Sequence, residues 1–260
     1  MGAKAKRLAR FKEQHPICFF CATSPTETLD HVPSRECFKD KIGPEGFEFP
    51  ACQRCNHGAS QIEQVIALYL PLANHADLKP SEAQVQRLYE GVRNNNPELL
   101  PRLEMNARAA REFYREKNIK LPLGQTFAET PLLELPEGCA PAFELFARRL
   151  TCALYYREVG RPLPLDHHIA VGWVPCGDPV AGEVEKMATG MFSQINITNR
   201  RNTNIGEQFV YMWGYKAERN LFGCISQFGR SFLILGGVLG PNMQSREERW
   251  VLHRKDVPWV

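Results

Sequence analysis

Long hydrophobic runs are missing from this sequence, because no apolar stretch approaches the roughly 20 residues that a membrane-spanning helix needs. The N-terminal stretch MGAKAKRLARFKEQH has no apolar core, so we do not expect a secretory signal. Lys6 stands where a myristoylation signal prefers Ser or Thr, which argues against lipidation. We therefore expect a cytoplasmic protein that has no membrane partner.

A strong excess of charge of one sign is also missing, as are internal repeats and low-complexity tracts. Lys and Arg number 32 and Asp and Glu number 29, which gives a net charge of +3. This mildly basic balance permits a nucleic-acid partner but does not require one. Hydrophobic residues make up 43% of the chain and charged residues 23%, which is typical of a globular protein with a core.

Cysteine is plentiful, and its spacing points to a metal. Four of the nine cysteines form two CxxC pairs, Cys18 with Cys21 and Cys52 with Cys55. In a chain without an export signal, paired CxxC motifs favour metal binding over disulfides. We expect the other five to be small buried apolar residues, and they are Cys37, Cys139, Cys152, Cys176 and Cys224.

Four thiolates from two CxxC pairs complete a tetrahedral zinc site. Between Cys21 and Cys52 lie 30 residues, more than a minimal zinc ribbon needs, so a further structural element must lie between the pairs. A module this small buries little core, and the metal supplies the missing folding energy. Four protein ligands leave no open position, so this Zn²⁺ is expected to be structural rather than catalytic.

The whole chain is predicted to be an α+β protein in three parts. Residues 1–70 form a zinc-stapled module, residues 71–135 a helical connecting region, and residues 136–260 a C-terminal α+β domain. In the last part, AFELFARRLTCALYYREVG reads as an amphipathic helix that ends at Gly160. The segments EQFVYMWGYKA, NLFGCISQF and SFLILGGVLG read as strands with short turns, which favours an antiparallel sheet packed by that helix.

A group of polar residues lies within the zinc module. Asp30 and His31 stand between the two cysteine pairs, and Asn56 directly follows Cys55. A neutral histidine can take a proton from water, and a carboxylate can hold a hard divalent cation. Adjacent residues of a strand point to opposite faces, so Asp30 and His31 share one site only if the strand ends there, as the nearby proline in DHVP favours.

The order CxxC, then Asp-His-Val-Pro, then CxxC-Asn resembles the HNH nuclease family with its ββα-metal fold. The resemblance covers about residues 15–65, and CNHGAS looks like the variant in which Asn opens the helix. It implies that His31 is the general base, that Asp30 is a metal ligand, and that Asn56 braces the loop. The last metal-binding position of the motif falls to Glu63, two helical turns after Asn56, with His57 as the alternative.

The resemblance implies a metal-dependent endonuclease that hydrolyses phosphodiester bonds in DNA, with Mg²⁺ or Mn²⁺ as the catalytic ion. The family often carries Lys or Arg soon after the Asn, and none occurs between Asn56 and Glu63 here. Arg35, Lys39 and Arg54 are then the candidates for binding nucleic acid. The alternatives are a non-catalytic zinc-dependent nucleic-acid-binding module or an RNase that uses the same site. The role of residues 136–260 stays open, and a homodimer through this part is one option.

Overall fold

The computed structural model describes residues 2–73, 81–101, 107–116, 118, 135–176, 178–192, 194–200, 203–241 and 251–253. Its helices are α1 (Ala3–Gln14), α2 (Gln53–Ala73), α3 (Glu82–Asn95), α4 (Ala107–Glu116), α5 (Cys139–Val159) and α6 (Pro179–Met191). The strands of the first half are β1 (Thr28–His31) and β2 (Glu48–Ala51). Those of the second half are β3 (His168–Pro175), β4 (Gln194–Ile197), β5 (Asn199–Arg200), β6 (Thr203–Asn204), β7 (Val210–Lys216), β8 (Leu221–Phe228), β9 (Phe232–Leu239) and β10 (Val251–His253). The predicted α+β class is confirmed.

The N-terminal part contains a ββα unit. Strands β1 and β2 pair antiparallel, with Asp30 opposite Phe49 and His31 opposite Glu48. Helix α2 begins directly after β2 and continues past Pro71 to Ala73. A proline in the last turn of a helix removes only one late backbone hydrogen bond, so the helix tolerates it there. The first CxxC pair lies before β1, and the second lies where β2 gives way to α2, so this short unit brings the two pairs toward each other.

The predicted connecting region contains helices α3 and α4. Helix α3 begins where the Ser81 hydroxyl accepts a hydrogen bond from the backbone N–H of Gln84, at 3.2 Å, as an N-cap residue does. Residues 74–80, 102–106, 117 and 119–134 of this region lie outside the described residues. The expected division between the connecting region and the C-terminal part, after residue 135, therefore directly follows residues that are not described.

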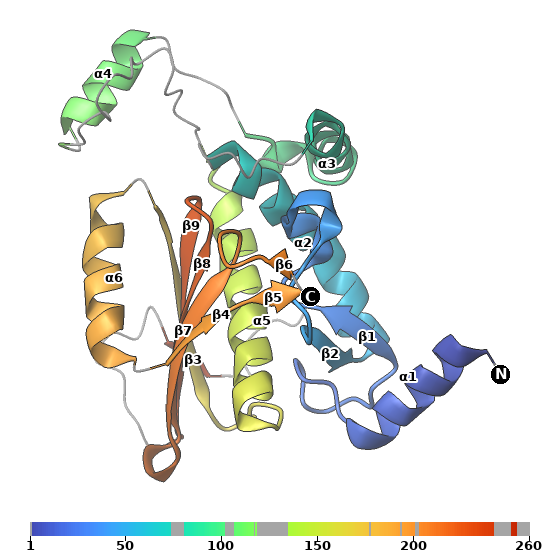
Figure 1. The fold of residues 1–260 in the computed structure, drawn as a ribbon. Coiled ribbons are helices and arrows are strands. Elements are labelled where there is room, and N and C mark those ends of the chain that lie inside the picture. The colour runs from blue at the N-terminus through green and yellow to red at the C-terminus, as the bar shows by residue number, and fades with distance from the viewer. Residues whose placement is uncertain are drawn as a thin grey trace.

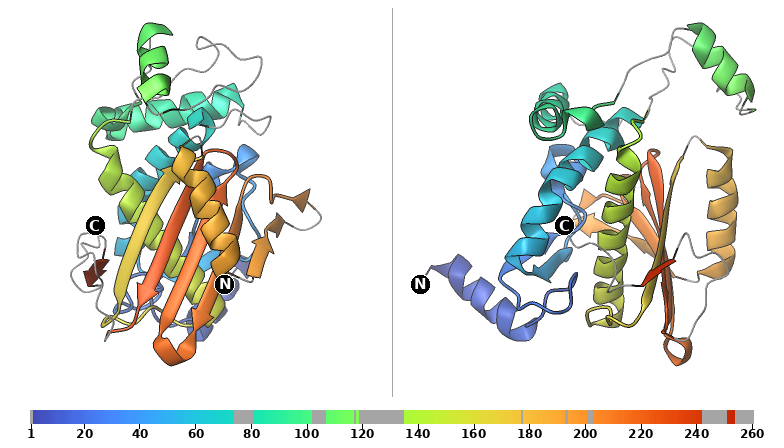
Figure 2. Two further views of the ribbon diagram at one scale, coloured as in Figure 1. Left: turned by 90° about the vertical axis from the view of Figure 1, so that its left-hand side faces the viewer. Right: turned by 180° about the vertical axis from the view of Figure 1, so that it is seen from behind.

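The second half of the chain is built on a six-stranded antiparallel sheet in the order β10-β3-β9-β8-β7-β4. The three strands expected from the sequence are β7, β8 and β9, and they lie side by side within this sheet. Helix α5 packs on one face and α6 on the other (Figures 1 and 2). On its far side α5 packs against α2, so α5 forms a layer between the sheet and the ββα unit (Figure 1).

Helix α5 ends as the sequence predicts, but its surroundings differ from the prediction. Gly160 follows the last helical residue with φ of 80° in the left-handed region, and its N–H donates to the Tyr156 carbonyl at 2.9 Å. An amphipathic helix would keep one polar face in solvent. Instead α5 is buried over most of its surface, because the sheet covers one side and α2 the other. It is the central helix of the molecule.

The hydrophobic core is continuous between the two halves of the chain. One cluster of buried side chains joins Phe19 of the cysteine loop, Leu68 of α2, Phe146 of α5 and Phe228 of β8. The N-terminal module and the sheet therefore share apolar contacts through α5. Of the helices in the described ranges, none is both long enough and apolar enough to cross a bilayer.

Candidate metal centre and histidine site

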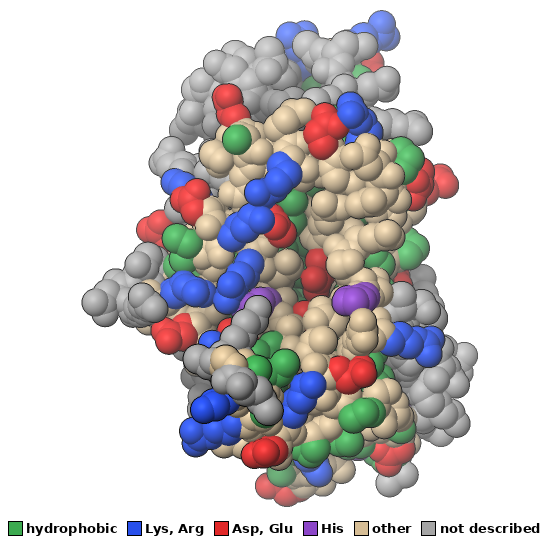
Figure 3. Space-filling view, turned by 90° about the vertical axis from the view of Figure 1, so that its right-hand side faces the viewer, with side chains coloured by type: hydrophobic (Ala, Val, Ile, Leu, Met, Phe, Trp, Pro, Cys, Tyr) green, Lys and Arg blue, Asp and Glu red, His purple; other side chains and the backbone are tan. Residues whose placement is uncertain are grey.

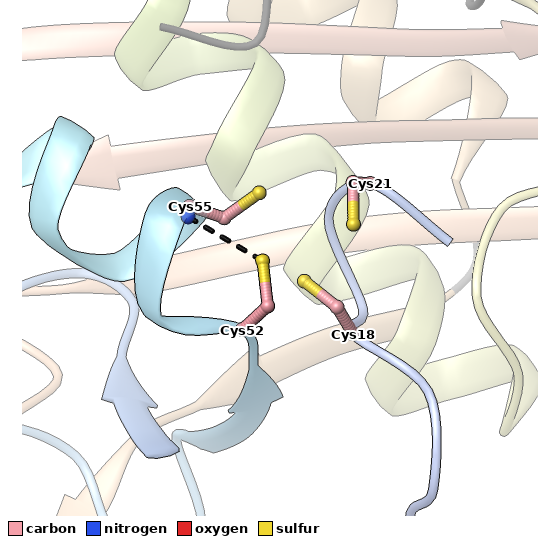
Figure 4. A group of neighbouring side chains, drawn as sticks. All are labelled: Cys18, Cys21, Cys52 and Cys55. Atoms are coloured by element: carbon pink, nitrogen blue, oxygen red, sulfur yellow. Dashed lines mark hydrogen bonds between the residues drawn. The ribbon is translucent and has the colours of Figure 1, made fainter. Parts of the chain in front are cut away.

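The four cysteines of the two CxxC pairs meet in space, as the sequence predicts. Cys18 and Cys21 lie in the loop between α1 and β1, and Cys52 and Cys55 lie at the start of α2. All four are buried, and their sulfur atoms lie within 4.8 Å of one another. Figure 4 shows the four side chains turned toward a common centre. This buried four-cysteine cluster has the donor set of a structural zinc site.

Backbone hydrogen bonds hold the cysteine loops in shape. The Cys18 carbonyl accepts from the N–H of Ala22 at 3.0 Å, and Ala22 has φ of 57° in the left-handed region. At the second pair, the N–H of Cys55 points to the sulfur of Cys52 at 3.5 Å (Figure 4). An N–H directed at a thiolate stabilises its negative charge. Both loops are thus arranged to offer thiolates to one ion.

Asn56 ties the first turn of α2 to strand β1. Its side-chain amide donates to the hydroxyl of Thr28 at 2.8 Å and to the carbonyl of Leu29 at 3.5 Å. Both acceptors directly precede Asp30 and His31. The amide therefore fixes the position of the strand that carries these two residues, relative to the cysteine cluster.

Asp30 and Glu63 converge on one cation, but that cation belongs to the protein. Arg149 reaches out of α5, and its guanidinium bonds to the Asp30 carboxylate and lies 3.5 Å from the Glu63 carboxylate. A third contact runs from Arg149 to the Cys55 carbonyl, at 2.8 Å. The exposed fractions are 1% for Arg149, 4% for Asp30 and 7% for Glu63, so the three groups form a buried charge cluster.

One guanidinium faces two carboxyl groups, and this sets their protonation. Burial raises the pKa of Asp30, and the positive charge of Arg149 opposes that rise. Burial also raises the pKa of Glu63 to about 8, against the Arg149 charge and with some help from the Asp30 charge. Asp30 makes the direct bond to the guanidinium, so the negative charge resides there. At neutral pH Glu63 is largely protonated.

His31 lies at the end of β1, next to this cluster but on the other face of the strand. Its side chain is half-buried, whereas Asp30 points into the core. Burial lowers the pKa of His31, the Arg35 charge lowers it further, and the Glu48 carboxylate opposes both. The imidazole is therefore neutral at physiological pH, which is the form that can accept a proton.

The competing positions for the last metal ligand differ in burial. His57 is exposed on α2, while Glu63 is buried and faces Asp30 through Arg149. Within the part of the chain that the structure describes, the four cysteines are the only group of three or more potential ligands close enough to share an ion. The structure thus brings Glu63 to Asp30, and leaves His57 apart from them.

The basic residues expected to bind nucleic acid lie in three settings. Arg35 lies 3.7 Å from Glu48, the residue opposite His31. Lys39 is exposed and its backbone N–H donates to Gln208, and Arg54 is exposed on α2. Figure 3 shows the side of the molecule on which β1 and β2 lie in Figure 1, with two histidine side chains on either side of a depression that contains acidic side chains, and Lys and Arg side chains in a band beside them.

Arg149 is the site residue that the sequence interpretation missed. A signal was present, because Arg148 and Arg149 are adjacent within a helix of mostly apolar residues. Adjacent helical residues point about 100° apart, so a helix buried on two sides must take at least one of two neighbouring arginines inward. A buried arginine needs carboxylate partners, and here they are Asp30 and Glu63, which the sequence interpretation had assigned to a divalent ion.

Comparison with known proteins gives no assignment for the chain. No family model, no curated protein and no solved structure matches it. Its function must therefore be argued from the residues themselves.

Proposed function

We propose that the protein is a metal-dependent endonuclease of the HNH type, which hydrolyses phosphodiester bonds in DNA on a zinc-stabilised ββα scaffold. The observation that carries this proposal is the pair of hydrogen bonds from Asn56 to the strand that ends in His31. Through them the helix that completes the cysteine cluster also positions a neutral, half-buried imidazole. A scaffold without chemistry has no need of a proton acceptor at this point.

The proposal assigns a divalent cation such as Mg²⁺ or Mn²⁺ to the carboxyl groups of Asp30 and Glu63. These two residues come from different elements and converge on one position, which the guanidinium of Arg149 takes in this structure. An ion would bind there only in exchange for that guanidinium and for the proton of Glu63, whose Oε1 atom is buried and has no hydrogen-bond partner among the described residues. A hard divalent ion prefers such oxygen ligands, and when bound it offsets the charge that builds on a phosphate during hydrolysis.

In the proposed reaction His31 accepts a proton from a water molecule as the water oxygen bonds to phosphorus. The bond between phosphorus and the 3′ oxygen breaks, and that oxygen leaves and takes a proton from solvent. Asn56 keeps β1, and with it His31, in place during this step. Because burial disfavours the charged imidazole, His31 is ready to accept the proton at neutral pH.

Exposed basic side chains around His31 favour a polyanionic substrate. Two acids hold four cations here, because Arg7 and Arg35 both pair with Glu48, while Lys41 and Arg87 both pair with Glu36. Within these contacts four cations face two carboxylates, which is an excess of two positive charges. An excess of exposed positive charge attracts the phosphates of nucleic acid, and the attraction falls as salt increases.

The test is plasmid cleavage by the His31→Ala variant in Mg²⁺ or Mn²⁺. Loss of the general base is expected to lower cleavage by about 10²-fold or more, while zinc stays at one ion per chain. His57→Ala is the matched comparison, because His57 is exposed on the same module, and it is expected to cleave like the unaltered protein. Cleavage by His31→Ala at the unaltered rate would rule out the proposed role.

A second candidate function is a non-catalytic nucleic-acid-binding module on the same zinc scaffold. One observation favours it, since Arg149 already neutralises Asp30 without any added ion. The two candidates differ in a direct measurement. A binding module retains DNA in a salt-dependent gel-shift assay and leaves it intact with every divalent ion. Parallel assays with RNA of the same sequence separate the DNase from an RNase at this site.

A further inference from the structure

The carboxylate of Glu48 contacts two arginines that come from different elements of the fold. The Nη2 atom of Arg7, in α1, bonds to Oε2 of Glu48, and the Nη2 atom of Arg35, in the segment after β1, lies 3.7 Å from Oε1. Glu48 is the partner of His31 in the β1–β2 pair, and directly opposite residues of an antiparallel pair project to the same face. The two guanidinium groups and the carboxylate therefore lie beside the imidazole.

Contacts at the C-terminal end of α1 hold Arg7 in this place. Phe11 follows Arg7 by about one helical turn, and its ring centroid lies 4.6 Å from that of His15. His15 in turn shares a hydrogen bond of 2.7 Å with the hydroxyl of Tyr156 in α5. Figure 1 shows α1 beside β1 and β2, with its N-terminal end directed away from the body. Arg7 thus reaches Glu48 from a helix that lies outside the ββα unit.

The group of Arg7, Arg35 and Glu48 has donors and charge left for an anion. Its two guanidinium groups and one carboxylate carry one net positive charge, and the side chains of Arg7 and Arg35 are 69% and 43% exposed. A guanidinium has five N–H donors, and the closest contact of each with Glu48 uses a single nitrogen. A phosphodiester carries one negative charge and two free oxygens, which suits two guanidinium groups side by side.

We propose that Arg7 and Arg35 together form a binding site for one phosphodiester group of DNA, next to the phosphate on which His31 acts. Glu48 keeps the two guanidinium groups close to each other before DNA binds. The arginines hold the substrate and take no part in the proton transfer. The inference rests on the proposed function for the identity of the substrate, and it adds a contact from α1 that the ββα unit does not contain.

The test is the binding of a fluorescently labelled DNA duplex, measured by anisotropy over a series of salt concentrations. The zinc-loaded chain is used without added divalent ions, so that the duplex stays intact. Arg7→Gln is expected to weaken binding about tenfold, because a charged hydrogen bond to phosphate is lost. The slope of log K against log salt should also become less steep by about one, the value for a single phosphate contact.

Arg10→Gln is the matched control for Arg7→Gln. Arg10 is also an exposed arginine of α1, whereas the ion pairs of Glu48 among the described residues are with Arg7 and Arg35. Arg10→Gln should therefore weaken binding much less. Equal losses in the two variants would mean a general attraction between α1 and DNA, and no loss in Arg7→Gln would mean no contact. Either result would overturn the proposal.

The double variant Arg7→Gln/Arg35→Gln tests whether the two arginines share one phosphate. Its salt slope should be about one less steep than that of the unaltered protein, since only one phosphate contact is lost. A decrease of about two would indicate two separate phosphate contacts and would contradict a shared site. Arg7→Lys keeps the charge but lacks the planar fork, so it should bind more weakly with an unchanged slope. Full affinity in Arg7→Lys would refute a site built on guanidinium geometry.

The outcome is separable from that of the nuclease assay, because binding is measured whether or not DNA is cut. DNA binding that depends on Arg7, with no cleavage by the unaltered protein, would support the phosphodiester site and refute the nuclease. Cleavage that depends on His31, with DNA affinity indifferent to Arg7, would support the nuclease and refute the site.

Discussion

Cys55 acts at the site through three different atoms. Its sulfur belongs to the four-cysteine cluster, its N–H points to the sulfur of Cys52, and its carbonyl accepts a hydrogen bond from Arg149. A single residue therefore links the four-cysteine cluster to the buried charge cluster. Because the two centres share a backbone unit, loss of the ion from the cysteines is expected to disturb Arg149 as well.

The variant Cys55→Ser tests this link. A serine hydroxyl does not replace a thiolate on zinc, so we expect zinc content to fall well below one ion per chain, and stability to fall with it. Metal analysis of the purified chain and urea unfolding supply the two measurements. Cys176→Ser is the control, because Cys176 lies outside the cluster and this variant should keep its zinc. Full zinc occupancy in Cys55→Ser would contradict the assignment of the four-cysteine zinc site.

At the scale of single elements, the C-terminal end of α5 depends on the backbone conformation of Gly160. Gly160 has φ of 80°, a conformation that costs a residue with a Cβ roughly 1 kcal/mol or more. A methyl group added there would meet no atom within 4 Å, so the backbone alone sets the cost. The residue after α5 is thus a glycine for conformational reasons.

We predict that Gly160→Ala lowers the free energy of unfolding by about 1 kcal/mol. The control is Gly182→Ala in α6, where an added methyl also meets no atom within 4 Å but the backbone is helical. There alanine is expected to be neutral or to stabilise by up to about 1 kcal/mol. Urea unfolding measures both changes, and effects of the same sign in the two variants would refute the explanation.

Elements with a strong local pattern can be predicted from the sequence. Helix α5 and strands β7, β8 and β9 each carry a periodic run bounded by glycine or polar turns, and all four form. Strand β4 and helix α6 escape prediction, because their short or small-residue segments carry little periodic signal. Local patterns also do not reveal what covers an element, which is why the sequence alone predicts an amphipathic α5.

The candidate site likewise has one part that the sequence predicts and one part that it does not. Cysteine spacing is enough to bring four thiolates together, since the CxxC motif is local and the metal geometry supplies the rest. The partner of Asp30 cannot be found by spacing, because Arg149 belongs to another element that meets β1 only after folding. Ion pairs across long sequence separations depend on the tertiary arrangement, and one sequence contains no direct measure of it.

At the scale of the whole molecule, the layers depend on one another. Helix α5 packs against the sheet on one side and α2 on the other, and one core cluster includes residues of all three. In a fragment that begins just before α5, the side of α5 that α2 normally covers would be exposed. Arg149 would then lack its partners Asp30 and Glu63. The sheet and the N-terminal ββα unit should therefore unfold together.

We predict that a fragment of residues 136–260 does not fold cooperatively by itself. Its α5 would present a large apolar face and a cation to water, and the hydrophobic contribution of that face to stability would be lost. Circular dichroism during heating should show a broad transition, whereas the full chain should show a single sharp one. A sharp transition at the Tm of the full chain would mean that this part is an independent domain.

The ion pair between Arg149 and Asp30 joins residues 119 positions apart, and this has a consequence for synthesis of the chain. At the usual rate of about 5 to 20 residues per second, the ribosome makes the arginine about 6 to 24 s after the aspartate. The four cysteines can come together during that interval. Asp30 and Glu63, however, cannot yet be buried as an ion pair, because Arg149 has not been synthesised. The first module to be translated is therefore completed only after translation has passed the middle of the chain.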